Sequence, residues 1–183
     1  NYLYKHTQMQ ESFGAIMLAL VDGEPKVLSL HQMLYHSLEH QKDVIVRRTR
    51  YDLDKAEARA HILEGLLIAL DNIDEIVRII RNSPNTVEAK TQLMERFALT
   101  DKQAQAILDM RLARLTGLER ERLQEEYAEL EKTIAYLRAV LADEKMVLGI
   151  IREEILAIKA KYADERRTQI SVMDGEIDPE DLI

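Results

Sequence analysis

Two separated stretches of the chain carry apolar residues that alternate by three and four positions, and this spacing constrains the fold more than any other feature. The first stretch covers about residues 30–71, and the second covers 119–163. Such spacing places the apolar side chains along one stripe of a helix, as in a coiled coil. The residues expected in the buried seam are Leu53, Ala60, Leu63, Leu67, Leu123, Leu130, Ile134, Leu137, Leu141, Leu148, Ile151 and Ile155.

The two stretches must run antiparallel if they pair within one chain, because a compact insert turns the chain between them. The second stretch keeps its phase over about 40 residues, which predicts a helix of roughly 60 Å. A charged fraction of 32% with only 5% aromatic residues also favours long helices over a sheet-rich globule. We therefore predict a mainly α fold: a long intramolecular antiparallel coiled coil with a small helical domain at its tip and a few β-strands at its base.

The chain ends carry strand signals. An apolar run, an Asp22-Gly23 turn and a second run at Lys26-Val27-Leu28 predict a β-hairpin, and residues 166–172 predict another strand. An acidic tail follows, and the chain starts at Asn1 rather than Met, so we expect a piece of a larger protein. The predicted segments are 1–29 (hairpin), 30–71 (outgoing helix), 72–118 (helical domain), 119–163 (returning helix) and 164–183 (return strand and acidic tail).

The helical domain at 72–118 is expected to consist of short helices. Asp71-Asn72 interrupts the first seam, Asn82-Ser83-Pro84 stops a short helix, Asn85 or Thr86 begins the next, and Thr100 with Gln103 forms a capping box. A further capping box is predicted at Thr116 and Glu119.

The helix predicted from Asp101 to about Arg114 is apolar on nearly every side, so it should be buried on more than one face. So small a domain has too little core to cover it, and a second copy of the chain, related by a twofold axis, is the simplest cover. The alternative is that the long helices and a short helix at Ile73–Ile80 cover it. The candidate interface residues are Ala104, Ile107, Leu108, Met110, Arg111, Leu112 and Leu115.

The sequence offers few candidate residues for an enzymatic site. The chain has no cysteine, which excludes disulfides and thiolate chemistry and fits a reducing, cytoplasmic compartment. His36 and His40 lie four apart and match a zinc-peptidase pattern, but no third ligand is suggested, and a solvated or capping role is the alternative. Tyr51 has no base or oxyanion donor beside it. We assign no catalytic, cofactor or metal residue.

Nucleic-acid contact has only local support. The net charge of -8 is a poor match for DNA. Arg47, Arg48 and Arg50 could contact phosphates, but ion pairs with nearby carboxylates such as Asp52 explain the cluster equally well. No apolar run is long enough to span a bilayer. The residues alone indicate a scaffold, a hinge or a dimerising arm.

Several stretches resemble the A subunits of bacterial DNA gyrase, and the resemblance covers essentially the whole chain. They are Gln8–Gly14, Met17–Gly23, Val46–Tyr51, Arg59–Leu66, Ala69–Asp74, Gln103–Leu112 and Leu115–Glu119. The A-type subunit of topoisomerase IV is similar in the arginine and coiled-coil parts. The stretches around Ser12-Phe13-Gly14 and Leu115–Glu119 look more like gyrase.

The resemblance implies an ATP-dependent type IIA topoisomerase that introduces negative supercoils by double-strand passage. It implies that residues 1–29 end a tower domain, that the coiled coil leads to a dimerising exit gate, and that the transported DNA duplex passes between the two arms. The B subunits of an A2B2 holoenzyme would supply the Mg and ATP sites. The family's cleaving tyrosine lies upstream of this region, so we expect the chain to be inactive alone. Asp71-Asn72 and Asp143-Glu144 are the expected joints.

Two interpretations of a different class stay open on the residues alone. One is a generic coiled-coil dimerisation scaffold unrelated to DNA. The other is a small zinc hydrolase built on His36 and His40.

Overall fold

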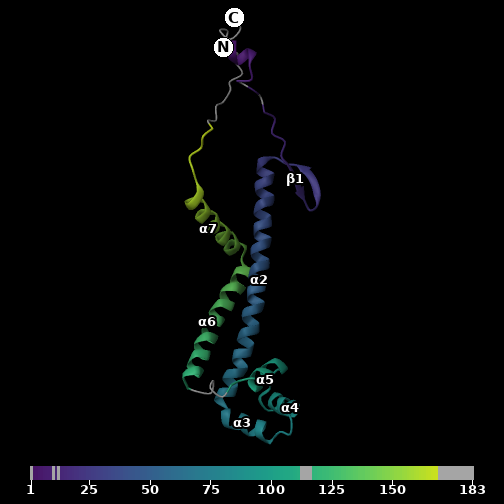
Figure 1. Cartoon of the computed structure of the whole chain (residues 1–183), viewed down its shortest axis with the longest axis vertical. Coiled ribbons are helices and arrows are strands. Elements are labelled where there is room, and N and C mark those ends of the chain that lie inside the picture. The colour runs from purple at the N-terminus through teal and green to yellow at the C-terminus, as the bar shows by residue number, and fades with distance from the viewer. Residues whose placement is uncertain (1, 10, 12, 112–116, 169–183) are drawn as a thin grey trace. The chain divides into compact units, whose positions relative to one another are not determined.

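The fold is mainly helical with one small antiparallel sheet (Figure 1), as the sequence predicts. This computed structural model describes residues 2–9, 11, 13–111 and 117–168. The elements are α1 (Tyr2–His6), β1 (Leu18–Val21), β2 (Glu24–Val27), α2 (Leu30–Asp71), α3 (Ile73–Asn82), α4 (Thr86–Phe97), α5 (Asp101–Leu108), α6 (Gly117–Ala142) and α7 (Glu144–Tyr162). The chain divides into two units, Asn1–Gln41 with Ile151–Ile183, and Lys42–Ile150.

The first unit contains the hairpin. β1 and β2 pair antiparallel, with Leu18 opposite Val27. Asp22 and Gly23 both have positive φ, 54° and 82°, as a two-residue type I′ turn requires. The predicted hairpin is therefore confirmed. The second predicted strand is not found in its described part, because residues 166–168 are irregular, and the rest of it lies outside the described residues.

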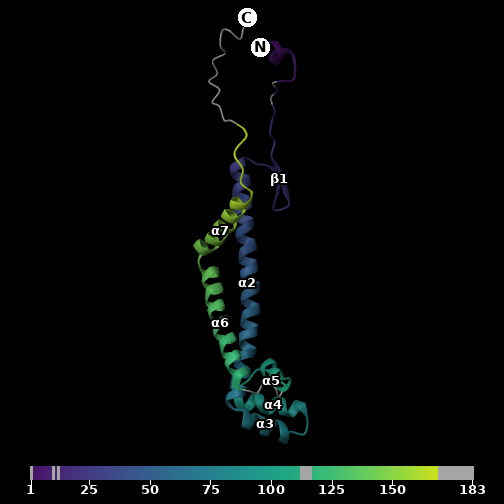
Figure 2. The same ribbon diagram turned by 60° about the vertical axis from the view of Figure 1, so that its left-hand side comes forward.

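The second unit is built on α6 lying alongside the part of α2 that belongs to this unit (Figures 1 and 2). Ion pairs join the two helical stretches, and the partner number falls as the α2 number rises, so the stretches run antiparallel. The pairs are Lys42–Glu144, Glu57–Arg138, Arg59–Glu126 and Asp71–Arg120. Exposed ion pairs contribute little stability, so the apolar contact between the helices supplies most of it.

Small side chains allow the two helices to approach closely. Ala56 and Ala60 of α2 are buried against Ile134 of α6, and Tyr127 and Leu130 pack around this cluster. The exposed fraction of Ala56, Ala60 and Ile134 is between 5% and 7%. The pairing of a large residue with two small ones is the interdigitation that a coiled-coil seam needs.

The second stretch is two helices rather than the single helix of 119–163 that we predict from its phase. α6 ends at Ala142, and α7 begins at Glu144. Asp143 separates them because its carboxylate accepts a hydrogen bond from the backbone N–H of Lys145 at 2.9 Å, as an N-cap does. The break coincides with one of the two expected joints. The other also coincides with a break, since α2 ends at Asp71 and α3 begins at Ile73.

The predicted seam residues differ in their burial within the single chain. Among the predicted residues, those buried are Ala60, Leu63, Leu123, Ile134 and Ile151, and those half-buried are Leu53, Leu67, Leu130, Leu137 and Leu141. Leu148 and Ile155 are 38% and 47% exposed within the single chain, so their place in the seam stays a prediction. Val140 and Val147 are buried instead, because the break at Asp143 prevents the phase of α6 from continuing into α7.

Across the described parts of the chain, no helix combines the length and apolar character needed to cross a bilayer.

Candidate self-association groove between α3 and α5

Three short helices, α3, α4 and α5, form the insert between α2 and α6, and each begins or ends at a local signal in its sequence. Asn85 begins α4 by accepting a hydrogen bond from the N–H of Glu88 at 2.9 Å. Thr100 begins α5 in a complete capping box with Gln103. Ser83 ends α3 and hydrogen-bonds Ile79. These boundaries confirm the predicted capping signals, except for the predicted box at Thr116, which lies outside the described residues.

A single apolar core joins the insert to the two long helices. Leu63 of α2, Ile76 of α3 and Leu93 of α4 are among its most deeply buried large side chains, each no more than 2% exposed. The other buried members are Leu66, Ala69, Leu99, Ala104, Ile107 and Leu123. Each insert helix therefore contributes to a core that it shares with α2 and α6, and the insert is packed as part of the second unit.

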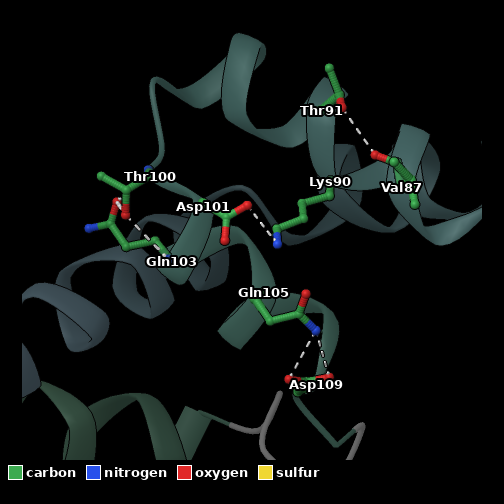
Figure 3. Close-up of polar contacts among 8 residues, drawn as sticks. All are labelled: Val87, Lys90, Thr91, Thr100, Asp101, Gln103, Gln105 and Asp109. Carbon is green, nitrogen blue, oxygen red and sulfur yellow. Dashed lines mark hydrogen bonds and ion pairs between the residues drawn. The ribbon is translucent and has the colours of Figure 1, made fainter.

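Ion pairs on the insert surface connect successive helices. Arg96 of α4 donates to Glu75 of α3, with Nε and Oε1 2.7 Å apart, and Glu75 raises the pKa of Arg96 through this hydrogen bond and its charge. Lys90 of α4 lies 2.7 Å from Asp101, the first residue of α5 (Figure 3). In each pair one partner is exposed and the other is partly shielded, so the pairs add modest stability and restrict the relative positions of the helices.

An apolar groove of about 500 Å³ lies between α3 and the end of α5. Its lining residues are Ile73, Ile76, Val77, Ile80, Arg81, Ile107, Leu108 and Met110. All of these except Arg81 are apolar. A groove of this composition is suited to apolar side chains from a partner surface rather than to chemistry on a polar substrate.

The residues predicted for self-association divide between the core and the groove. Ala104 and Ile107 are 0% and 4% exposed within one chain, where they belong to the chain's own core. α2, α3 and α6 take part in burying them, which is the alternative cover that the sequence left open. Leu108 and Met110 are half-buried and line the groove.

The other candidates lie beyond α5. Arg111 is exposed and lines a second pocket with Asp109 and Arg59, while Leu112 and Leu115 lie outside the described residues. α5 is also shorter than predicted. It ends at Leu108, where Met110 donates its N–H to the carbonyl of Ile107 in a tighter turn.

Sequence reasoning misses the α3 half of the groove. Ile73, Val77 and Ile80 form the outer stripe of a strongly amphipathic helix, which the spacing reveals but which we interpret only as cover for α5. A helix of ten residues that buries Ile76 on one side and carries Ile80 at 37% exposure on another has more apolar surface than its own core needs.

The described parts of the chain contain no cluster of three or more His, Asp or Glu side chains able to hold a metal ion, and His36 and His40 belong to no such cluster. In the basic stretch of α2, Arg47 pairs with Asp43 at 3.0 Å and Thr49 is buried. Arg47 therefore makes an exposed ion pair within its own helix.

The second unit is thus a helical hairpin in which two long helices are joined by a packed insert that carries an apolar groove. Residues 1–156 match the family model that describes the A subunit of DNA gyrase and topoisomerase IV. The chain belongs to this family.

Curated relatives match over the entire chain. It is 60% identical to the DNA gyrase A subunit of Clostridium acetobutylicum, 59% identical to that of Halalkalibacterium halodurans and 56% identical to that of Deinococcus deserti, each over 183 residues. The chain spans 22% to 23% of the length of these relatives.

Proposed function

We propose that this chain is the arm and the self-associating exit gate of a DNA gyrase A subunit. The observation that carries the proposal is the apolar groove between α3 and α5, in the insert that joins an antiparallel helix pair. An arm of this kind would act as a lever with a contact surface at its tip. The family membership and the names of the relatives support the assignment to gyrase.

In the whole protein, the chain would serve ATP-dependent double-strand passage that introduces negative supercoils. Two A subunits would act in the cytoplasm in an A2B2 assembly with two B subunits, which would supply the ATP and Mg sites. The transported duplex would pass between two arms and leave when their contact opens. The corresponding region of topoisomerase IV is the alternative, because the family model covers both enzymes.

A second copy of the chain is the occupant we propose for the groove. A twofold axis would bring the same apolar surface of each copy against the other, so one surface suffices for both sides of the contact. Val77, Ile80 and Leu108 would be buried there, and Arg81 would lie at the rim, where a charge keeps its solvent. A contact that opens once in each reaction cycle would also be consistent with a small apolar surface such as this groove.

A matched pair of valines tests this surface. Val77 lines the groove, whereas Val87, on α4, is 74% exposed and lies outside it. We expect Val77→Glu to convert the dimer to a monomer in light scattering, because it buries an unpaired charge at the contact. Val87→Glu should remain dimeric. Equal masses for the two variants would contradict the assignment of the groove.

Activity is tested by segment exchange. A gyrase A subunit whose corresponding segment is replaced by this chain should supercoil relaxed plasmid when it is combined with the B subunit and ATP. The same exchange carrying Val77→Glu should supercoil more slowly. An inactive exchange with intact folding and intact dimerisation would contradict the gyrase assignment. The chain by itself is expected to leave plasmid topology unchanged.

A further inference from the structure

The shape of the groove depends on where α5 lies. α3 supplies one wall, while Ile107, Leu108 and Met110, at and just after the end of α5, supply the other. α5 has only eight residues, about 12 Å of helix, which is too short to be stable without tertiary contacts. Whatever holds α5 against α2 therefore sets the position of that wall.

Gln103 links α5 to α2 by a buried hydrogen bond, in addition to the apolar contacts of Ala104 and Ile107. It is 4% exposed, and Nε2 of its amide donates to the backbone carbonyl of His61 at 2.8 Å. Its Oε1 accepts a hydrogen bond from the N–H of Thr100 at 3.0 Å. The hydroxyl of Thr100 lies 2.7 Å from Nε2 of His61, so one polar network spans α2 and the start of α5. Figure 3 shows Thr100 and Gln103 facing each other at that start.

The backbone of α2 leaves room for Gln103 at Gly65. A Cβ added to Gly65 would lie 2.7 Å from both Cβ and Cγ of Gln103, which is closer than side-chain atoms approach. The side chain of Gln103 on α5 therefore packs directly against the backbone of α2 at Gly65. Since no buried side-chain N or O in the described residues lacks a hydrogen-bond partner, the network is complete as well as tight.

We propose that Gln103 is the positioning residue for self-association: by fastening α5 to α2, it fixes Leu108 and Met110 opposite α3 and gives the groove the shape that a second copy binds. This inference rests on the proposed self-association. It adds that affinity between copies depends on a residue that the partner never touches, four positions before Ile107 on the same helix.

Two glutamines on one helix provide the test. Gln103→Met keeps the length of the side chain but removes its amide, so α5 loses the hydrogen bond from Gln103 to the carbonyl of His61, while the contact between Thr100 and His61 can remain. Gln105→Met makes the same change at an exposed position, where the amide donates to the carboxylate of Asp109, at 3.2 Å (Figure 3), and to no other group among the described residues. The dissociation constant of the dimer is measured by analytical ultracentrifugation, at a temperature where circular dichroism shows every variant folded.

We expect Gln103→Met to raise the dissociation constant by about tenfold or more, and Gln105→Met to leave it within about twofold of the unsubstituted chain. Hydrogen exchange should become faster at α5 amides in the first variant while α4 amides keep their protection. Because the chains are folded during the measurement, a purely global loss of stability would not change the constant. Equal constants for both variants overturn the positioning role but leave self-association intact, whereas a monomeric unsubstituted chain overturns both.

Discussion

Arg59 of α2 and Glu126 of α6 form a two-bond contact, with Nε 2.7 Å from Oε1 and Nη2 3.0 Å from Oε2. The hydrogen bond to Glu126 raises the pKa of Arg59, while partial burial opposes that shift. The two residues lie 67 positions apart in sequence, so the contact fixes which turn of α6 lies beside which turn of α2.

The Arg59–Glu126 pair should contribute modestly to stability. A double-mutant cycle with Arg59→Ala and Glu126→Ala is expected to give a coupling free energy of about 0.5–1 kcal/mol, the upper part of the range for exposed pairs, because the contact is bidentate. The coupling, measured by urea unfolding, should shrink at about 1 M salt, where screening is strong. A coupling of zero at low salt would mean that the contact does not restrain the register.

Gly65 should tolerate no side chain. Gly65→Ala places a methyl group against Gln103, and we expect it to lower the free energy of unfolding by about 1–3 kcal/mol despite the better helix propensity of alanine. Gly149→Ala is the matched control, since no atom lies within 4 Å of an added Cβ there and the residue is inside α7. That variant should gain up to about 1 kcal/mol. Loss of stability in both variants would contradict close packing as the cause.

Ile134 should contribute strongly to the stability of the seam between α2 and α6. Ile134→Ala leaves a cavity against Ala56 and Ala60, and we expect it to cost about 2–4 kcal/mol in chemical unfolding. Leu118→Ala, on the same helix at 63% exposure, should cost less than about 0.5 kcal/mol. Similar costs at the two positions would mean that α6 is not buried along the predicted stripe.

Asp143 should act as the cap that separates α6 from α7. Asp143→Ala removes the acceptor for the N–H of Lys145, so we expect a loss of about 1 kcal/mol in thermal or chemical unfolding. Asp143→Asn retains a capping oxygen and should lose less. An increase in stability with higher helix content would show that the break comes from Asp143 itself, and that alanine joins the two helices into one.

Local signals predict much of the fold. The Asp22-Gly23 turn, the capping box at Thr100 and the stop at Asn82-Ser83-Pro84 each depend on neighbours within a few residues, and each is present in the structure. The antiparallel order of the α2–α6 ion pairs also follows from connectivity alone.

The features that the sequence does not predict are those that depend on contacts between residues far apart in the chain. The apolar character of α5 is visible in the sequence, but whether its own chain or a second copy covers Ile107 depends on where α3 and α6 pack. The role of Gly65 is likewise invisible until Gln103, 38 positions further along the chain, is placed against it. Leu148 continues the heptad of α6 and Val147 does not, yet Val147 is the buried residue, because the break at Asp143 changes the phase of α7.

Self-association through the insert underlies both functional proposals, and sedimentation equilibrium of the unsubstituted chain measures it without any substitution. At micromolar concentrations we expect a mass twice the chain mass of 21.2 kDa, falling toward the single-chain value on dilution. A mass that stays at that of one chain across the accessible concentration range would rule out a gate formed by this insert.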